Sequence, residues 1–134
     1  MRELGYYEKP EYLMGMLSCQ MTRACRVVID VGSHLELPIP SDAPFHPGAR
    51  WSYELAVEML ETMAGMAGDH ARSEVIRYLG WPAQAISYKV GERLILELRD
   101  ALKQRPDFRL KDFHSRVLGF GNVALARLKD LVIS

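Results

Sequence analysis

The sequence predicts an all-α fold with five to six helices and one long proline-rich loop between the first helix and the second. Apolar residues recur at spacings of three, four and seven through most of the chain, which is typical of helical faces. No stretch shows the sustained alternation of apolar and polar residues that marks a strand, and no internal repeat is visible. With 134 residues, positions 1–134 are expected to form a single helical domain.

The first helix is expected to begin at Pro10, because proline suits the first position of a helix, and to end at Gly32. The apolar positions at helical spacing are Leu13, Leu17, Ala24, Val28 and Val31. Methionines and further aliphatic residues fill much of the remaining surface. A helix that is apolar nearly all round is expected to be buried on several sides.

Residues 35–50 form the predicted irregular segment, because its prolines break any helix and lack an amide donor. These prolines are Pro38, Pro40, Pro44 and Pro47. The apolar side chains of the same segment indicate that the loop packs against the domain. A loop of this length in a compact domain is usually functional or folded down as a lid.

Ser52 is a good N-cap for the second helix, and Asp69 is expected to cap a short third helix that ends before Gly80. Pro82 is expected to open a long helix over residues 82–104, which Pro106 terminates. Two short helices follow, at about 110–118 and 123–132. Asn122 is the expected N-cap of the last one.

The charge balance argues against two classes of partner. Lysine plus arginine and aspartate plus glutamate each number 17, so the formal net charge is zero. We therefore expect neither a nucleic-acid partner nor a membrane partner. The apolar runs are too short to span a bilayer, and the N-terminus lacks the apolar core of a secretory signal. We expect a cytoplasmic protein, with Cys19 and Cys25 as unpaired thiols.

A polar line crosses the otherwise apolar first helix at Arg23, Arg26, Asp30 and His34. These residues share one side of the helix if it continues past Gly32. In a structural interpretation the line is a salt-bridge network, and Arg26 and Asp30 have the spacing of an i, i+4 ion pair. In a functional interpretation it is a cleft wall that binds an anionic group through arginine, with His34 as a hydrogen-bond donor. Spacing alone leaves both open.

Tyr88 is a second candidate, because it lies opposite the apolar stripe of its predicted helix and shares its face with Gln84. Gly91 follows one turn later. Glycine inside a helix costs about 1 kcal/mol relative to alanine, which suggests that another group approaches closely. Either Tyr88 is an amphipathic surface residue beside a packing notch, or its hydroxyl donates a hydrogen bond to developing negative charge in a site.

The four histidines form no recognisable zinc motif, since no two are four residues apart and no His-Glu-x-x-His is present. His34 and His46 could face one site, but a catalytic zinc needs about three protein ligands. No cofactor is therefore expected in this chain. A metal held by these two histidines and a carboxylate stays open as a third hypothesis.

Several segments together resemble the bacterial domain-of-unknown-function 885 family. They are ELGYY at 3–7, RACRVVIDVGSH at 23–34, EVIRYLGWPAQAISYKVG at 74–91, LRDA at 98–101 and FH at 113–114, followed by the closing leucine-rich helix. Each segment alone is a weak signal. The ordered set at family-like spacing is specific and covers nearly the whole chain.

The resemblance implies a helical, zincin-like metallopeptidase. Members carry a His-Glu-x-x-Pro-Gly-His motif and a Glu-Gly-Trp segment that supply zinc ligands, both just upstream of the Leu-Gly-Tyr-Tyr piece. This chain therefore resembles only the C-terminal part, and zinc is expected only in the full-length protein. The resemblance carries over a substrate-facing wall: Arg23, Arg26, Asp30, Gln84 and Lys89 for binding, and His34 and Tyr88 for stabilising the oxyanion of a tetrahedral intermediate.

Two departures from the family pattern stand out. Ala83 occupies a position where the family usually has glycine, which puts a close backbone approach before Tyr88 in doubt. Arg109 occupies a position where a helix-capping aspartate is usual, which weakens a cap by about 1 kcal/mol.

Two functions are therefore in competition. In the first, the chain is the substrate-binding C-terminal half of a metallopeptidase-like, hydrolase-related protein, inactive alone and able to hold a peptide-like substrate once the metal-binding half is present. In the second, it is a stand-alone helical binding or interaction module without catalytic activity. Helices that faced a missing half would expose apolar surface, so we expect a homo-oligomer formed through such faces.

Overall fold

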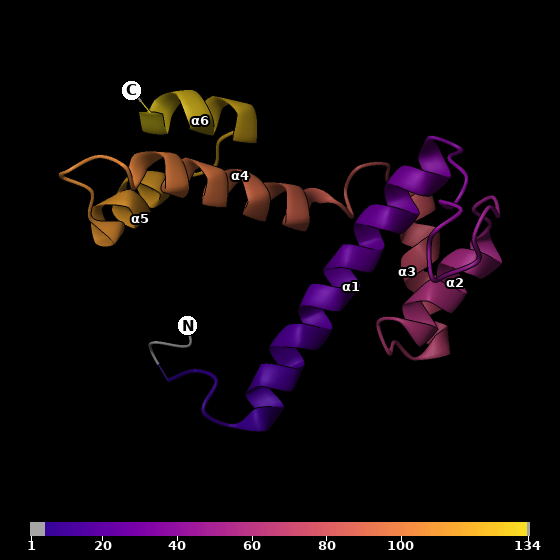
Figure 1. The fold of residues 1–134 in the computed structure, drawn as a ribbon. Helices are drawn as coiled ribbons and strands as arrows, with labels where there is room; N and C mark the ends of the chain where they lie inside the picture. Colours follow the sequence, from indigo (N-terminus) through magenta and orange to yellow (C-terminus); the bar gives the residue numbers. More distant parts are fainter. Residues whose placement is uncertain (1–4, 134) are drawn as a thin grey trace. The chain divides into compact units, whose positions relative to one another are not determined.

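The computed structural model describes residues 5–133, and this part of the chain contains six α-helices (Figure 1). They are α1 (Pro10–His34), α2 (Tyr53–Thr62), α3 (Gly68–Gly80), α4 (Ser87–Leu102), α5 (Leu110–Gly119) and α6 (Leu125–Ile133). The described residues hold one isolated β-bridge, between Pro38 and Arg50. The predicted all-α class with five to six helices is confirmed.

The chain divides into two compact units, Met1–Ser87 and Tyr88–Ser134. The first contains α1 to α3 and the second is built on α4 to α6, and each has its own hydrophobic core. The single domain expected over positions 1–134 stays a prediction, because two compact units can belong to one domain.

The core of the first unit lies between the C-terminal half of α1 and the pair α2 and α3. Ile29 of α1, Leu60 of α2, and Val75 and Tyr78 of α3 are fully buried in it. The N-terminal half of α1 extends beyond α2 and α3 (Figure 1). The expectation that α1 is buried on several sides was therefore wrong, since Met14 is 67% exposed in this extension.

Gly32 does not end α1, and the helix continues to His34. The glycine is buried, and a Cβ atom built on it would collide with the indole ring of Trp51. Gly32 is therefore required for close packing and not for helix termination. This correction decides the position of His34, which shares the helix with the residues before it.

Backbone hydrogen bonds within the segment between α1 and α2 fix its conformation. The amide of Ile39 donates to the carbonyl of Ala49 at 2.8 Å, and the amide of Gly48 donates to the carbonyl of Ile39 at 3.0 Å. Ile39 is buried, and Phe45 stacks on Trp51 with ring centroids 6.2 Å apart. The loop thus adds side chains to the first unit.

The starts of α2 and α3 differ in how well they were predicted. Ser52 caps α2 as expected, because its Oγ accepts a hydrogen bond from the amide of Leu55 at 3.3 Å. Asp69 does not cap α3, whose N-cap residue is Ala67 without a side-chain bond. The Asp69 carboxylate lies in the first turn, where it complements the helix dipole and pairs with Arg72.

The helix expected from Pro82 begins only at Ser87. Ala83 has a φ of +66°, which no right-handed helix contains, so residues 81–86 form turns. This turn segment belongs to the first unit and carries Gln84. The change of boundary removes Gln84 from the helix that holds Tyr88.

The second unit packs α4, α5 and α6 around a small core of Leu98, Leu102, Phe113, Leu128 and Val132. Asn122 is not the N-cap of the last helix, which opens where the amide of Leu128 donates to the carbonyl of Ala124. Arg105 and Arg116 donate to carbonyl oxygens in the last turn of α6, each at 3.1 Å. Cations at this end complement the helix dipole.

Within residues 5–133, no helix combines the length and the apolar run that a bilayer crossing requires. The two cysteines are free, with Cys19 exposed and Cys25 buried. Burial raises the pKa of the Cys25 thiol.

Candidate functional site

The polar line on α1 stays intact because the helix runs through His34. Each of its four residues lines a pocket in the surface of the first unit. Arg23 and Arg26 line one pocket, and Asp30 and His34 line a second. The residues that the helical spacing picked out as a polar line therefore all line surface pockets.

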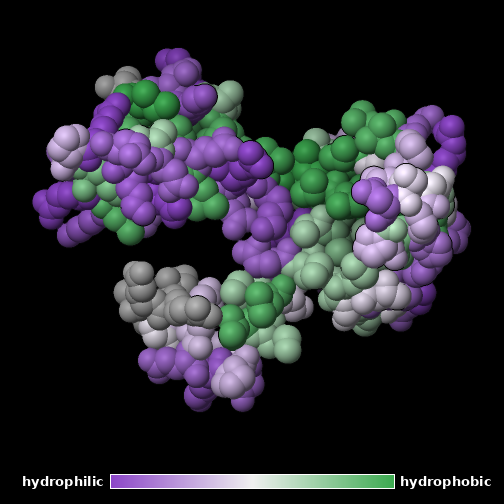
Figure 2. Space-filling model, viewed as in Figure 1, coloured by the Kyte–Doolittle hydropathy of each residue, from purple (hydrophilic) through white to green (hydrophobic). Residues whose placement is uncertain are grey.

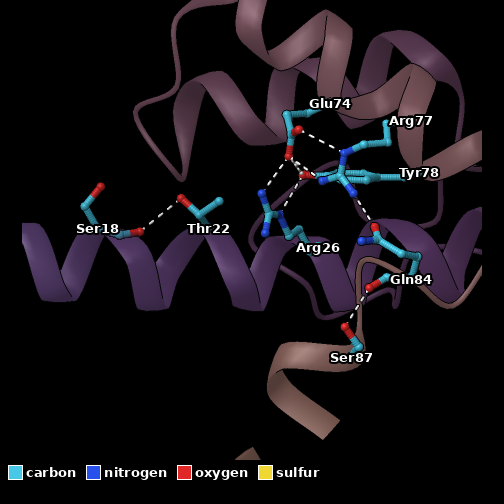
Figure 3. Close-up of polar contacts among 8 residues, drawn as sticks. All are labelled: Ser18, Thr22, Arg26, Glu74, Arg77, Tyr78, Gln84 and Ser87. Carbon is cyan, nitrogen blue, oxygen red and sulfur yellow. Dashed lines mark hydrogen bonds and ion pairs between the residues drawn. The ribbon is translucent and has the colours of Figure 1, made fainter. Parts of the chain in front are cut away.

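Arg26 is held by α3 through a cluster that joins the two helices (Figure 3). Its Nη2 lies 2.6 Å from Oε2 of Glu74, and its Nε donates to the hydroxyl oxygen of Tyr78 at 2.8 Å. The Tyr78 hydroxyl donates in turn to Glu74 Oε2 at 2.7 Å. On the other side, Arg77 Nη2 donates to the same oxygen at 2.8 Å, and Arg77 Nη1 donates to Oε1 of Gln84.

Burial and hydrogen bonds oppose each other at the carboxylate of this cluster. Burial alone would raise the pKa of Glu74, but the hydrogen bonds from Arg77, Tyr78 and Arg26 outweigh it and lower this pKa to about 2. Burial, reinforced by the bond to Glu74, raises the pKa of Tyr78 to about 12. Near neutral pH the cluster therefore holds two arginine cations and one carboxylate anion, which leaves an excess of positive charge.

The first pocket lies beside this excess of positive charge. It has a volume of about 220 Å³ and is lined by Ser18, Cys19, Thr22, Arg23, Arg26, Met66 and His70. Its titratable lining consists of two arginines, one histidine and one thiol. Arginine recognises planar anions such as carboxylates through paired N–H donors, so this pocket has the chemistry of an anion site.

The second pocket has a volume of about 270 Å³ and is lined by Asp30, Val31, His34, Leu35, Pro82, Ala83 and Ile86. Its charged member, Asp30, is only 2% exposed. Asp30 Oδ2 accepts a hydrogen bond from the amide of Ala83 at 3.0 Å. This bond ties α1 to the 81–86 turns.

Asp30 also orients the imidazole of His34. Nδ1 of His34 lies 2.9 Å from the carbonyl oxygen of Asp30 and 3.0 Å from its Oδ1. The nitrogen is well aligned with the carbonyl, whereas the buried Oδ1 has no aligned donor. Since both neighbours are acceptors, Nδ1 must carry the hydrogen, and Nε2 is left for another partner.

The structure shows other partners for Arg26 and Asp30 than the i, i+4 pair that their spacing suggests. Arg26 pairs with Glu74, and Asp30 pairs with His34 and the Ala83 amide. The reason is tertiary, because α3 offers a carboxylate and a phenol directly opposite Arg26. Spacing along one helix could not reveal these partners.

The other predicted site residues divide between the units. Gln84 joins the Arg26 cluster through Arg77. Tyr88 and Lys89 begin the second unit, where Tyr88 is 50% exposed and the Lys89 ammonium pairs with Glu92 at 2.8 Å. Five of the predicted site residues lie in the first unit: Arg23, Arg26, Asp30, His34 and Gln84.

Three residues of the cluster were not predicted as site residues: Glu74, Arg77 and Tyr78. Their spacing of three and four residues places them on one side of α3, and that pattern was the available signal. This pattern could not be distinguished from that of a core-facing side, because the same side of α3 also carries buried apolar residues. Their roles became visible only when α1 supplied Arg26.

Among residues 5–133, no group of three or more histidine, cysteine, aspartate or glutamate side chains is arranged to hold a metal ion. His34 and His46 have separate carboxylate partners, since His46 Nε2 lies 2.8 Å from Oε1 of Glu58. The described residues therefore do not fit a complete zinc site.

Comparison with known protein families places the chain in a described family. A family model described as "Bacterial protein of unknown function (DUF885)" matches residues 1–132. No curated protein matches the chain. The matched range takes in nearly all of both compact units.

Proposed function

Because the chain belongs to the bacterial DUF885 family of unknown function, we propose that it is the substrate-binding part of a zinc metallopeptidase-like protein, resembling its C-terminal half. The family's zinc ligands have no counterpart among the motifs of this chain. When bound, zinc would polarise a substrate carbonyl and activate water.

The observation that carries the proposal is that all four residues of the α1 polar line border pockets of the first unit. The pocket at Arg23 and Arg26 accepts an anionic group of a peptide-like substrate, such as a carboxylate. The neighbouring Glu74 leaves this region positive because it is shared by Arg26 and Arg77. Binding of the anion would orient the rest of the substrate along α1.

His34 acts on the same substrate through Nε2. A neutral ring protonated on Nδ1 presents Nε2 as an acceptor, for example for a peptide N–H. Donation to an oxyanion requires a ring protonated on both nitrogens, and Asp30 lies where it can pair with the resulting positive charge. In keeping with the family resemblance, Gln84 of the first unit contacts substrate in this proposal, and Tyr88 and Lys89 are assigned hydrogen-bonding and binding roles within the second unit.

The proposal is tested by binding. A short peptide with a free C-terminal carboxylate is titrated into the chain, and amide chemical shifts are followed by NMR. We expect chemical-shift changes around Arg23 and His70. The peptide affinity obtained from them should fall at least tenfold in Arg23→Gln. It should stay unchanged in Arg72→Gln, because the Arg72 guanidinium lies outside the pocket. Equal binding of the amidated peptide, or equal affinity of both variants, would contradict the proposal.

Catalysis by the isolated chain is a separate question. We expect no turnover of peptides by this chain with added zinc, because the described residues supply no complete metal site. Robust hydrolysis under these conditions would show that it completes a site by itself. Calorimetry with zinc then separates this case, since a site built on His34, His46 and a carboxylate would bind zinc below millimolar concentration.

One observation favours the alternative of a helical binding module without catalytic activity. Arg26 is engaged by Glu74 and Tyr78 and is only 17% exposed at its side chain. This cluster stabilises the α1–α3 contact whatever the pocket binds. If peptide titration gives no shifts and Arg26→Gln only lowers stability, the polar line is structural.

A further inference from the structure

A stripe of exposed apolar side chains runs along α1, from its N-terminal half into its C-terminal half. Met14 is 67% exposed, Leu17 is 51% exposed, Met21 is 45% exposed and Val28 is 47% exposed. Ala24, which lies between the last two, is also exposed. We name Met14, Leu17, Met21, Ala24 and Val28 the α1 stripe, and Figure 2 shows hydrophobic surface along much of this helix.

The spacing of the α1 stripe is that of a coiled-coil seam. Its successive intervals are three, four, three and four residues, which is an unbroken heptad pattern of positions a and d. With 100° per residue, the stripe lies about 150° around the helix from the polar line at residues 23–34. It is therefore a different surface from the proposed substrate site.

The charges around the stripe favour one kind of partner. Residues 12–22 contain no charged side chain. Glu8 and Glu11 lie near one end of the stripe, where Lys9 offsets one of them, and Arg23 lies toward the other end, between Met21 and Ala24 in sequence but on the polar-line side of the helix. Two copies of this helix packed antiparallel would bring the acidic end of each beside the basic end of the other, whereas parallel packing would bring like charges together.

The sizes of the side chains agree with antiparallel packing. When two copies cross near residue 19, Met14 of each faces Ala24 of the other, and Leu17 faces Met21. A large residue then meets a small one at each end of the seam, so the backbones can approach closely. The helix dipoles also run in opposite directions.

We propose that the α1 stripe is a homodimerisation seam, in which α1 packs antiparallel against α1 of a second copy of this chain. The seam extends over residues 10–28, about 27 Å of helix. It buries the apolar face of α1 that the first unit leaves exposed. The proposal does not depend on substrate binding, because the polar line lies on another face.

Sedimentation equilibrium of the full chain tests the proposal. We expect a dimer at micromolar concentration and a dissociation constant raised at least tenfold in Leu17→Glu. Ile76→Glu is the matched control, because Ile76 is 63% exposed on α3 and lies outside the seam. Circular dichroism verifies that both variants remain helical. A wild-type chain that is monomeric at high concentration would overturn the proposal, and so would equal weakening of the dimer by both variants.

Disulfide trapping tests the orientation and does not depend on a destabilising variant. In a Cys19→Ser background, Ser18→Cys lies near the expected crossing point and should form a disulfide-linked dimer under mild oxidation. Glu11→Cys lies at one end and should not, because antiparallel packing separates the two copies of residue 11. Crosslinking of both variants to the same extent would indicate parallel packing and overturn the proposed arrangement. Absence of crosslinking in Ser18→Cys would overturn it also.

Discussion

Arg26 and Glu74 are 48 residues apart in sequence, and their ion pair of 2.6 Å joins α1 to α3. Both side chains are largely buried, with 17% and 13% of their surface exposed. Exposed ion pairs contribute little to stability, whereas removal of one partner from a buried pair leaves the other charge without compensation. The Arg26–Glu74 pair behaves more like a buried pair. Tyr78 and Arg77 also donate hydrogen bonds to the Glu74 carboxylate.

Glu74→Gln should therefore lower the free energy of unfolding by about 2–3 kcal/mol at neutral pH, because it leaves Arg26 and Arg77 without their shared anion. Asp69→Asn is the control, since it breaks the pair with Arg72 at the surface of the same helix. The control should change stability by less than about 0.5 kcal/mol. Urea denaturation measures both, and equal losses would contradict a buried, shared carboxylate.

The stability contributed by Glu74 should depend on pH. Its pKa is lowered from 4.5 to about 2 in the folded chain, so the unfolded state binds a proton first as the pH falls. This contribution is fully present above about pH 5 and is lost progressively as the pH falls through the folded value. We expect the difference in unfolding free energy between wild type and Glu74→Gln to shrink between pH 5 and pH 2. A difference that stays constant over this range would show that the charge of Glu74 is not what stabilises the cluster.

Double-mutant cycles should identify the true partner of Arg26. The cycle of Arg26→Gln with Glu74→Gln should give a coupling free energy of at least about 1 kcal/mol, because the two side chains are in contact. The cycle of Arg26→Gln with Asp30→Asn should give less than about 0.5 kcal/mol, because Asp30 is bonded to His34 and Ala83 instead. A larger coupling free energy for Arg26 with Asp30 than for Arg26 with Glu74 would show that the i, i+4 partner is the true one.

Local sequence signals predicted the helices, whereas tertiary contacts decided the site. Proline at position 10 and serine at position 52 act through neighbouring residues, so they could be interpreted directly. Gly32 was misinterpreted because its requirement comes from Trp51, 19 positions later in the chain. Arg26 was correctly placed on a polar line, but its partner lies on another helix, and no local pattern encodes that distance.

Two glycines in α1 should respond oppositely to the same substitution. Gly32→Ala places a methyl group against the Trp51 indole, so we expect a loss of about 2 kcal/mol or more in the free energy of unfolding. Gly15→Ala meets nothing within 4 Å and should stabilise the helix by about 0.5–1 kcal/mol. Thermal and urea denaturation of both variants give the comparison. A loss at Gly15 as large as at Gly32 would mean that glycine 15 has a packing partner as well.

Ala83 has a φ of +66°, in the left-handed region that glycine adopts most readily. An L-residue in this left-handed region costs roughly 1–2 kcal/mol, which glycine avoids, although glycine also loses more backbone entropy on folding. We therefore expect Ala83→Gly to raise the free energy of unfolding by up to about 1 kcal/mol, while its amide still donates to Asp30. Ala83→Val is the control at the same position and should destabilise, because a β-branched residue tolerates this conformation least. In urea denaturation the free energy of unfolding should be highest with glycine at position 83, intermediate with alanine and lowest with valine. The opposite order would indicate that the 81–86 turns adopt another conformation in solution, in which the Ala83 amide no longer has to donate to Asp30.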